Sequence, residues 1–211
     1  MAATNLCIVR HGETAWNAER RVQGQLDIPL NLIGLAQAQA VGAALASERF
    51  SAIYSSDLSR AHRTAAPAAQ ALRLEVALDE RLRERHYGVF ETLTYAECET
   101  RYPEEFARFL AREPEFDFRT GESLRAFAER SLHCIAELAE RHAGENVLVF
   151  THGGVLDKLF RRATGRLLGA QRDFRIPNAA INRIVIEGGD WRVLTWADCA
   201  HLKGALDDLL E

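Results

Sequence analysis

The feature that most constrains the fold is a short apolar run at residues 6–9, which leads directly into Arg10, His11 and Gly12. An apolar run with β-branched members that ends at a glycine is typical of a buried strand, here one that delivers Arg10 and His11 into a loop. In open α/β sheets, ligands bind at the carboxyl ends of the strands. Arginine suits phosphate because its guanidinium is a permanent, fork-shaped cation, and a neutral imidazole can attack phosphorus and leave again. The pair predicts covalent phosphoryl chemistry, although a strand end with an exposed arginine and a hydrogen-bonded histidine also fits these two residues.

Two further strand ends carry side chains of the same kind. Residues 52–55 predict a second buried strand, and Arg60 follows in the first turn of a helix, where a cation opposes the helix dipole unless it holds an anion. A solvated surface arginine is the alternative for Arg60. Residues 147–150 predict a third strand, which leads into His152 and Gly153 at the start of another helix. Two arginines and two histidines at one sheet edge would repel one another, so a bound oxyanion such as a phosphoryl group is expected there.

A leaving alkoxide also needs a proton, and a partly buried carboxylic acid is a suitable donor. Glu13 and Glu84 are the two candidates. Glu84 lies between arginines in a segment rich in aromatic residues and glycine, unlike the carboxylates on the predicted helix surfaces. The alternative role for Glu84 is an ion pair with Arg83 or Arg85.

Capping residues place the main helices. Asn31 is an expected N-cap for a helix that reaches residue 46, and Ser123 is an expected N-cap for a long helix that reaches residue 142. Residues 95–112 also have helical spacing. The expected apolar stripe of the helix after Asn31 is Leu35, Ala38, Val41, Gly42 and Leu45.

Other local signals concern turns and loops. Ser56 or Asp57 is an expected N-cap for the helix that carries Arg60, and Pro67 is expected to kink or end that helix. The polar loop at residues 20–29 is expected to fold over the pocket. Residues 181–186 and 191–195 predict two strands joined by a hairpin turn, and the acidic C-terminal tail is expected to be frayed or helical.

Length and composition limit the class of protein. The 211 residues show no linker, so one domain over residues 1–211 is expected, with a lid or insertion at about 91–121. No signal peptide or membrane span is visible, which predicts a cytoplasmic protein without a membrane partner. The net charge of −4 offers no general attraction to nucleic acid. The four cysteines lie far apart, with no C-x-x-C pair, and are expected to be reduced thiols rather than a zinc site or disulfides.

Four motifs occur in order between residues 6 and 186. They are Arg10-His11-Gly12-Glu13-Thr14 with Asn17, then Arg60 within Ser-Asp-Leu-Ser-Arg-Ala, then Glu84, and finally Thr151-His152-Gly153-Gly154. Together they resemble the histidine phosphatase superfamily, the phosphoglycerate mutase-like proteins.

The resemblance implies an α/β fold, a three-layer α/β/α sandwich with a mixed, mainly parallel sheet, and no metal or organic cofactor. It implies that His11 becomes a phosphohistidine and that Glu84 donates the proton. Homodimers are common in the family, so a homodimer is one expected assembly. The residues that the resemblance implies in binding phosphate are Arg10, Arg60 and His152, and those that approach the phosphate or substrate are Asn17, Gln23, Gly24 and Gly153.

Two activities share this chemistry. The run from Glu84 to Gly88 looks like that of the cofactor-dependent mutases, in which the residues matching Arg85 and Tyr87 help to bind the acid substrate. Those mutases carry a lysine where this chain has Tyr95, and a longer basic lid, whereas residues 91–121 here are rich in carboxylates. The expected function is therefore hydrolysis of a small phosphorylated metabolite by a phosphomonoesterase. A 2,3-bisphosphoglycerate-dependent phosphoglycerate mutase and a catalytically silent binder of a phosphorylated ligand are the alternatives.

Overall fold

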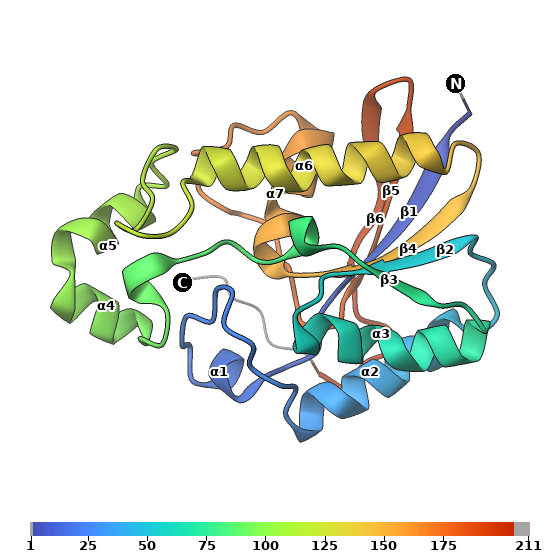
Figure 1. Ribbon diagram of the computed structural model, residues 1–211, viewed down its shortest axis with the longest axis horizontal. Coiled ribbons are helices and arrows are strands. Elements are labelled where there is room, and N and C mark those ends of the chain that lie inside the picture. The colour runs from blue at the N-terminus through green and yellow to red at the C-terminus, as the bar shows by residue number, and fades with distance from the viewer. Residues whose placement is uncertain (1, 205–211) are drawn as a thin grey trace.

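The computed structural model describes residues 2–204, which form a six-stranded sheet with helices on both faces (Figure 1). The strands are β1 Thr4–Arg10, β2 Ala52–Ser55, β3 Val76–Leu78, β4 Asn146–Thr151, β5 Ile181–Glu187 and β6 Asp190–Asp198. Their order in the sheet is β3-β2-β4-β1-β5-β6. The four strands from β3 to β1 pair in parallel, whereas β5 and β6 are antiparallel. The predicted mixed, mainly parallel sheet and the C-terminal hairpin are confirmed.

The helices form a layer on each side of this sheet. They are α1 Ala15–Ala18, α2 Leu32–Leu45, α3 Ser59–Leu72, α4 Tyr95–Arg101, α5 Pro103–Leu110, α6 Leu124–Arg141 and α7 Gly153–Thr164, with short 3₁₀ turns η1 Glu80–Leu82 and η2 Gly88–Phe90. Along β1, Leu6 and Ile8 pack into a core shared with α6 and α7, while Cys7 and Val9 pack into a core shared with α2 and α3. This alternation confirms the predicted three-layer sandwich, with α6 and α2 on opposite sides of the sheet in Figure 1.

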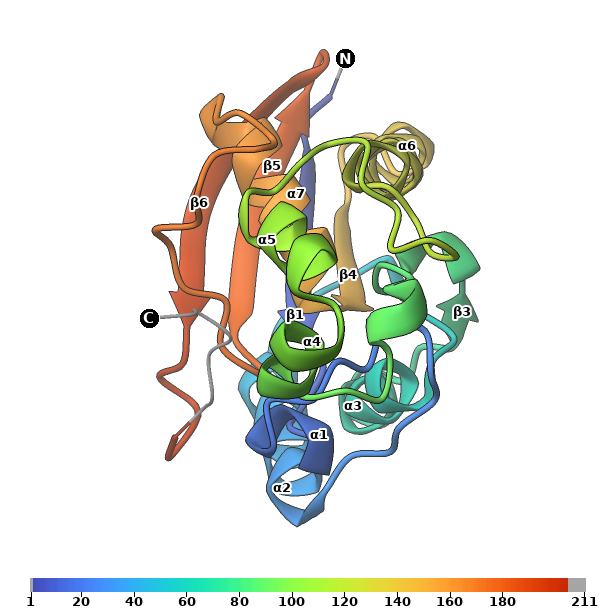
Figure 2. The ribbon, with the colours of Figure 1, turned by 90° about the vertical axis from the view of Figure 1, so that its left-hand side faces the viewer.

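Residues 91–121 form α4, α5 and the irregular chain that follows them. Figure 1 shows these two helices at one end of the molecule, away from the sheet, and Figure 2 is the view onto that end. They share an aromatic core with η2, in which Phe90, Phe106, Phe116 and Phe118 are buried. The phenylalanines of this segment therefore pack mainly on one another.

The expectation of one helix over residues 95–112 was wrong in detail. The chain leaves the helical conformation at Tyr102, which has φ −138° and ψ 58°, and Pro103 starts α5 at its first position. Proline disfavours helical backbone in the residue before it and is well tolerated at a helix start, which explains the break.

The two predicted N-caps, Asn31 and Ser123, are confirmed, since each accepts a hydrogen bond from a backbone N–H of the first helical turn. On α2, however, Leu35 is 41% exposed, and Gly34 and Gln37 take buried positions instead. The stripe prediction was wrong at Leu35 because the start of α2 packs on the polar loop after β1, where a small residue and an amide fit better than leucine.

The start and the length of α3 also differ from expectation. Its N-cap is Leu58, without a side-chain cap, because Asp57 forms an ion pair with Arg83 instead. The helix continues past Pro67 to Leu72, so this proline does not end it. The acidic tail at residues 205–211 lies outside the described residues.

Cys7, Cys98 and Cys134 are buried, and Cys199 is partly buried. Burial raises the pKa of the Cys7 thiol to about 12. Within residues 2–204, no helix has the length and apolar character that a bilayer span requires.

Gly34 at the start of α2 provides a test of this packing. A Cβ at this position would lie 2.0 Å from the backbone oxygen of Glu13, in the loop that follows His11. We expect Gly34→Ala to lower the free energy of unfolding by roughly 1–3 kcal/mol, because neither backbone can move aside easily. Urea unfolding measures the change. Gly169→Ala is the matched control, since its Cβ would meet its nearest atom at 3.4 Å, and an equal loss in both variants would contradict the close approach.

Candidate active site

The register between β1 and β4 brings the two histidines together. Arg10 lies opposite Thr151 in this parallel pair, so His11 and His152 are the next residues on adjacent strands. Their ring centroids are 5.1 Å apart, and both side chains are buried. The predicted meeting of the strand ends is therefore observed.

The tautomer of His11 is determined by its backbone contact. Its Nδ1 lies 2.7 Å from the carbonyl oxygen of Gly12, which can only accept, so Nδ1 carries the proton and Nε2 keeps a lone pair. The N–H of Gly12 donates to Thr64 Oγ1 and fixes this turn. Burial, and then the positive charges of Arg60 and Arg10, hold the pKa of His11 well below its usual value. His11 is thus a neutral imidazole with Nε2 available for attack.

Two buried arginines flank His11, and backbone carbonyls hold both of them. Arg60 donates from Nη1 to Leu26 O at 2.8 Å and from Nη2 to Gly24 O at 2.7 Å, while Arg10 donates to the carbonyl of Ile176 at 2.5 Å. These contacts place the loop at residues 20–29 over Arg60, as the sequence predicts. Burial is the main cause that lowers the pKa of Arg60, to about 10. The Nε atom of Arg60 is buried and has no hydrogen-bond partner among residues 2–204.

His152 lies beside His11. Its Nε2 is 2.8 Å from Ser56 Oγ, which also accepts from the N–H of Leu58. The hydroxyl proton of Ser56 is then available for Nε2, which leaves the ring proton of His152 on Nδ1. Within the described chain this buried Nδ1 has no partner. A buried donor without a partner costs roughly 1–3 kcal/mol, so a partner is expected for both this atom and Arg60 Nε. A bound oxyanion would accept from both.

The two candidate acids, Glu13 and Glu84, lie in different surroundings. The Glu13 carboxylate accepts from Asn31, the N-cap of α2, and is buried in the loop after β1. Glu84 lines a cavity, where Oε2 accepts from Gly154 N–H at 2.9 Å and Oε1 accepts from Arg85 N–H at 2.8 Å. No ion pair joins Glu84 to Arg83 or Arg85 in the described residues, so the predicted alternative for Glu84 does not occur there.

Three of the predicted substrate residues lie in the chain that follows His11: Asn17 in α1, and Gln23 and Gly24 in the loop after it. Asn17 forms a capping box with Thr14, and its Oδ1 accepts from Thr14. Gln23 is 8% exposed, and its Oε1 is buried without a partner in the described part of the chain. Gly24 has φ +53°, and a Cβ there would lie 1.9 Å from a Glu91 carboxylate oxygen, so a side chain at this position would be strained.

The other three line the cavity. Arg85 is largely committed to the backbone, since Nε donates to the carbonyl of Glu122 and Nη2 to that of Phe116. Tyr87 packs edge-on against Phe118, and Gly153 is the first residue of α7. The structure thus brings Arg85, Tyr87 and Gly153 to one cavity beside Glu84.

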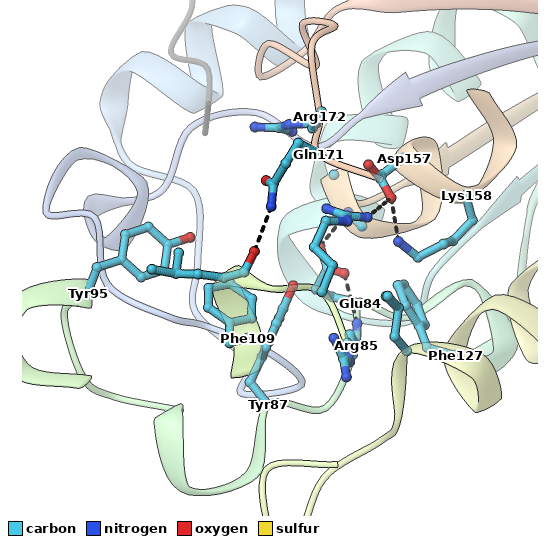
Figure 3. Close-up of a pocket in the computed structure, with 15 residues that line it drawn as sticks. Glu84, Arg85, Tyr87, Tyr95, Phe109, Phe127, Asp157, Lys158, Gln171 and Arg172 are labelled. Carbon is cyan, nitrogen blue, oxygen red and sulfur yellow. Dashed lines mark hydrogen bonds and ion pairs between the residues drawn. The ribbon is translucent and has the colours of Figure 1, made fainter. Parts of the chain in front are cut away.

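This cavity has a volume of about 170 Å³ and lies between α7, the segment around Glu84 and the end of α5 (Figure 3). Its charged lining is mainly basic: Arg85, Arg112, Lys158 and Arg172, against Glu84 and Asp157. The carboxylates of residues 91–121 are absent from this lining, and several of them pair with arginines elsewhere, such as Glu105 with Arg119. The acidic character of residues 91–121 therefore does not extend to the lining of this cavity.

Asp157, Lys158 and Arg112 are cavity residues that the sequence analysis missed. Lys158 and Arg112 both pair with the Asp157 carboxylate, and Arg161 on α7 also binds it. Burial lowers the pKa of Lys158 to about 8. The sequence carries one signal for these residues. Asp157 and Lys158 are two charged residues between leucines, on the buried side of a helix.

The described residues contain no cluster of three or more His, Cys, Asp or Glu side chains that could hold a metal ion.

Comparison with known proteins agrees with this geometry. The family model described as "Histidine phosphatase superfamily (branch 1)" matches residues 6–199. Phosphoglycerate mutase-like protein 4 of Arabidopsis thaliana is 40% identical over 202 residues, which covers 94% of this chain and 86% of the relative. The metal-independent phosphoserine phosphatase of Arabidopsis thaliana is 38% identical over 203 residues, which covers 95% of this chain and 84% of the relative. The solved structure of Bacillus stearothermophilus YhfR superposes with a TM-score of 0.88 at 34% identity and covers 94% and 98% of the two chains.

The buried His11 makes the stability of the fold depend on pH. The pKa of His11 lies well below 6.5 in the folded state, whereas the unfolded imidazole titrates near 6.5, so below pH 6.5 the unfolded state binds the extra proton. The free energy of unfolding therefore falls with falling pH, by up to about 1.4 kcal/mol per unit for this group. We expect His11→Asn to show a correspondingly shallower slope between pH 6.5 and 5.5 in urea unfolding. His133→Asn, on the exposed face of α6, controls for the loss of an imidazole, and a wild-type slope in His11→Asn would contradict a neutral His11.

Proposed function

The chain belongs to the histidine phosphatase superfamily, and we propose that it is a phosphomonoesterase that hydrolyses small phosphate esters through a phosphohistidine on His11. The observation that carries the proposal is the neutral imidazole of His11 beside two buried donors, Arg60 Nε and His152 Nδ1, that lack partners in the described structure. A tetrahedral phosphoryl group next to His11 Nε2 would bind both donors.

In the first step, Nε2 of His11 attacks phosphorus, so that a nitrogen–phosphorus bond forms as the ester bond breaks. Arg10, Arg60 and His152 stabilise the negative charge that spreads over the three phosphoryl oxygens. Asn17, Gln23 and the backbone at Gly24 and Gly153 are proposed to complete this phosphate site.

Glu84 is proposed to donate its proton to the leaving oxygen. In the second step, water attacks phosphorus, the nitrogen–phosphorus bond breaks, and Glu84 takes a proton from the water. The leaving group would occupy the cavity beside Glu84, with Arg85 and Tyr87 in its wall. Residues 91–121 are proposed to act as a lid over it, because Tyr95, Phe109 and Arg112 line the same cavity.

The basic lining of the cavity also supports the second candidate, a 2,3-bisphosphoglycerate-dependent phosphoglycerate mutase, because that substrate carries a carboxylate. Arg85 weakens this candidate, since two of its nitrogens already bind the carbonyls of Glu122 and Phe116. We therefore favour hydrolysis. A cytoplasmic location, a homodimer and a single domain stay predictions.

A panel of phosphomonoesters tests the function. We expect release of inorganic phosphate and, after an alkaline quench, phosphate on the protein that is stable to alkali and labile to acid. His11→Ala should lose both, because it removes the covalent step. Isomerisation of 3-phosphoglycerate in the presence of its bisphosphate, without comparable hydrolysis, would identify the mutase. A protein that binds phosphate esters but never acquires label would be the silent binder.

The identity of the leaving group tests Glu84. We expect Glu84→Gln to lower kcat by about 10²–10⁴ for alkyl phosphates, which need a proton on the leaving oxygen. The loss should be much smaller for p-nitrophenyl phosphate, because nitrophenolate leaves without protonation. Steady-state kinetics with both esters measures the difference. An equal loss for both would exclude Glu84 as the acid, and Glu13→Gln is the matched control.

A further inference from the structure

Glu84 lies in a segment without regular secondary structure, residues 83–87, between η1 and η2. No strand ladder or helix fixes such a segment, so its position depends on the groups that bind its backbone. We infer that Arg130 of α6 and Glu122 are positioning residues, which clamp this segment and thereby orient the Glu84 carboxyl toward the leaving group. The inference rests on the proposed role of Glu84 as the general acid.

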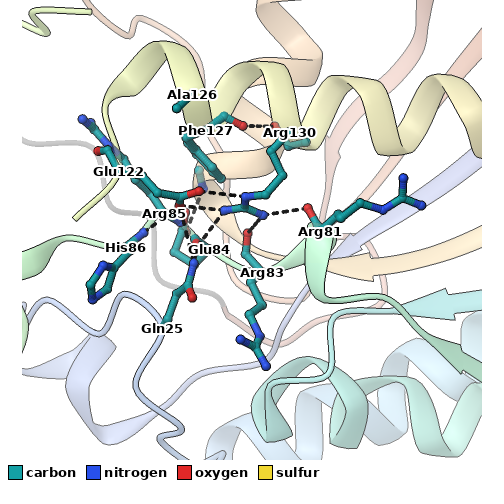
Figure 4. Close-up of polar contacts among 12 residues, drawn as sticks. Gln25, Arg81, Arg83, Glu84, Arg85, His86, Glu122, Ala126, Phe127 and Arg130 are labelled. Carbon is teal, nitrogen blue, oxygen red and sulfur yellow. Dashed lines mark hydrogen bonds and ion pairs between the residues drawn. The ribbon is translucent and has the colours of Figure 1, made fainter. Parts of the chain in front are cut away.

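Arg130 binds several carbonyls of the segment at once (Figure 4). Its Nη1 donates to the carbonyl of Arg81 at 2.7 Å and to that of Arg83 at 3.2 Å, and its Nη2 donates to that of Glu84 at 3.3 Å. The guanidinium also lies over the ring of Phe127, 5.2 Å from its centroid. One rigid, planar cation therefore determines the path of the backbone on both sides of Glu84.

Glu122 holds the clamp from the other side. Its carboxylate accepts two hydrogen bonds from Arg130, at 2.8 and 2.7 Å, and Oε2 also accepts from the N–H of His86 at 3.0 Å. Its backbone carbonyl binds Arg85 Nε. Burial alone would raise the pKa of the Glu122 carboxyl, but Arg130 and the His86 N–H outweigh burial and hold the pKa below its usual value. The clamp is therefore the ion pair of Arg130 and Glu122, which hydrogen-bonds to the backbone on both sides of Glu84.

Gln25 connects the clamp to the phosphate site. Its side-chain amide donates to the carbonyl of Glu84 at 3.1 Å and to the Glu122 carboxylate at 3.4 Å. Its neighbours Gly24 and Leu26 supply the two carbonyls that hold Arg60. The same loop thus holds both the phosphate-binding arginine and the backbone of the acid.

The carboxyl of Glu84 has little freedom to compensate for a backbone shift. Its oxygens accept from the N–H groups of Gly154 and Arg85, and a Cβ on Gly154 would lie only 2.0 Å from Oε1. Loss of the clamp would move the carboxyl relative to α7 and lengthen the path of the proton. Because a misplacement of about 1 Å can lower a rate by roughly 10²-fold, a residue that never touches the substrate can matter here.

The test is the leaving-group dependence of Arg130→Met, which keeps an apolar chain over Phe127 but removes every donor. We expect kcat to fall roughly 10–100-fold for an alkyl phosphate such as glycerol phosphate, and less than about threefold for p-nitrophenyl phosphate, with KM little changed. Arg130→Lys should behave similarly, because an ammonium lacks the fork. On the alkyl ester, Arg130→Met combined with Glu84→Gln should be no slower than Glu84→Gln alone, since no acid is then left to orient.

Arg125→Met is the control, an exposed arginine on the same helix that pairs with Glu115. Equal losses for the two esters, or losses that add to that of Glu84→Gln, would overturn the inference. Glu122→Gln provides the same comparison if Arg130→Met does not fold. Amide hydrogen exchange of residues 85 and 86 should accelerate in the clamp variants, and unchanged exchange would also overturn the inference. If the wild-type protein neither hydrolyses esters nor acquires label, the proposed function fails, while exchange still shows whether the clamp fixes the segment.

Discussion

The site depends on the register between β1 and β4. Their parallel pairing sets Arg10 opposite Thr151, and His11 and His152 therefore leave the sheet side by side. A slip of one residue in either strand would turn its histidine to the other face, because successive residues alternate across a sheet. In the observed register, Leu6 and Ile8 pack into one helical layer and Cys7 and Val9 into the other, so a slip of β1 would also exchange these two sets of side chains between the cores.

The electrostatics of the site follow from how its arginines are held. Arg60 and Arg10 bind backbone carbonyls, which position a guanidinium but do not neutralise its charge. The two imidazoles stay neutral because burial and these cations lower their pKa values. A carboxylate partner for Arg60 would compete with an oxyanion for the same donors. The carbonyls instead leave the charge of Arg60 to be balanced by the oxyanion that we propose to bind beside the neutral His11.

The sequence predicts the parts of the structure that depend on neighbouring residues. An apolar run followed by a basic residue and glycine marks the strand ends of His11 and His152, and a polar residue before an apolar stripe marks the caps at Asn31 and Ser123. Apart from the meeting of these strand ends and the loop over Arg60, the sequence does not predict contacts between distant segments. The three backbone carbonyls that Arg130 binds lie 46 to 49 residues away along the chain. From the local sequence pattern alone, Arg130 looks like an ordinary surface arginine on α6.

The residues that the sequence predicts and the contacts that it does not predict have different proposed roles. The groups proposed to act on phosphorus lie at the ends of strands or in the first turn of a helix, where hydrogen-bonded backbone fixes them. The cavity proposed for the leaving group is walled by irregular chain around Glu84 and Gln171, by the end of α5, by the start of α6, and by the face of α7 that carries Asp157 and Lys158. A change in those walls need not disturb the register that sets His11 and His152 together. The reaction can therefore be inferred from short motifs, whereas the substrate depends on contacts such as Arg112 with Asp157, 45 residues apart, that only the folded chain creates.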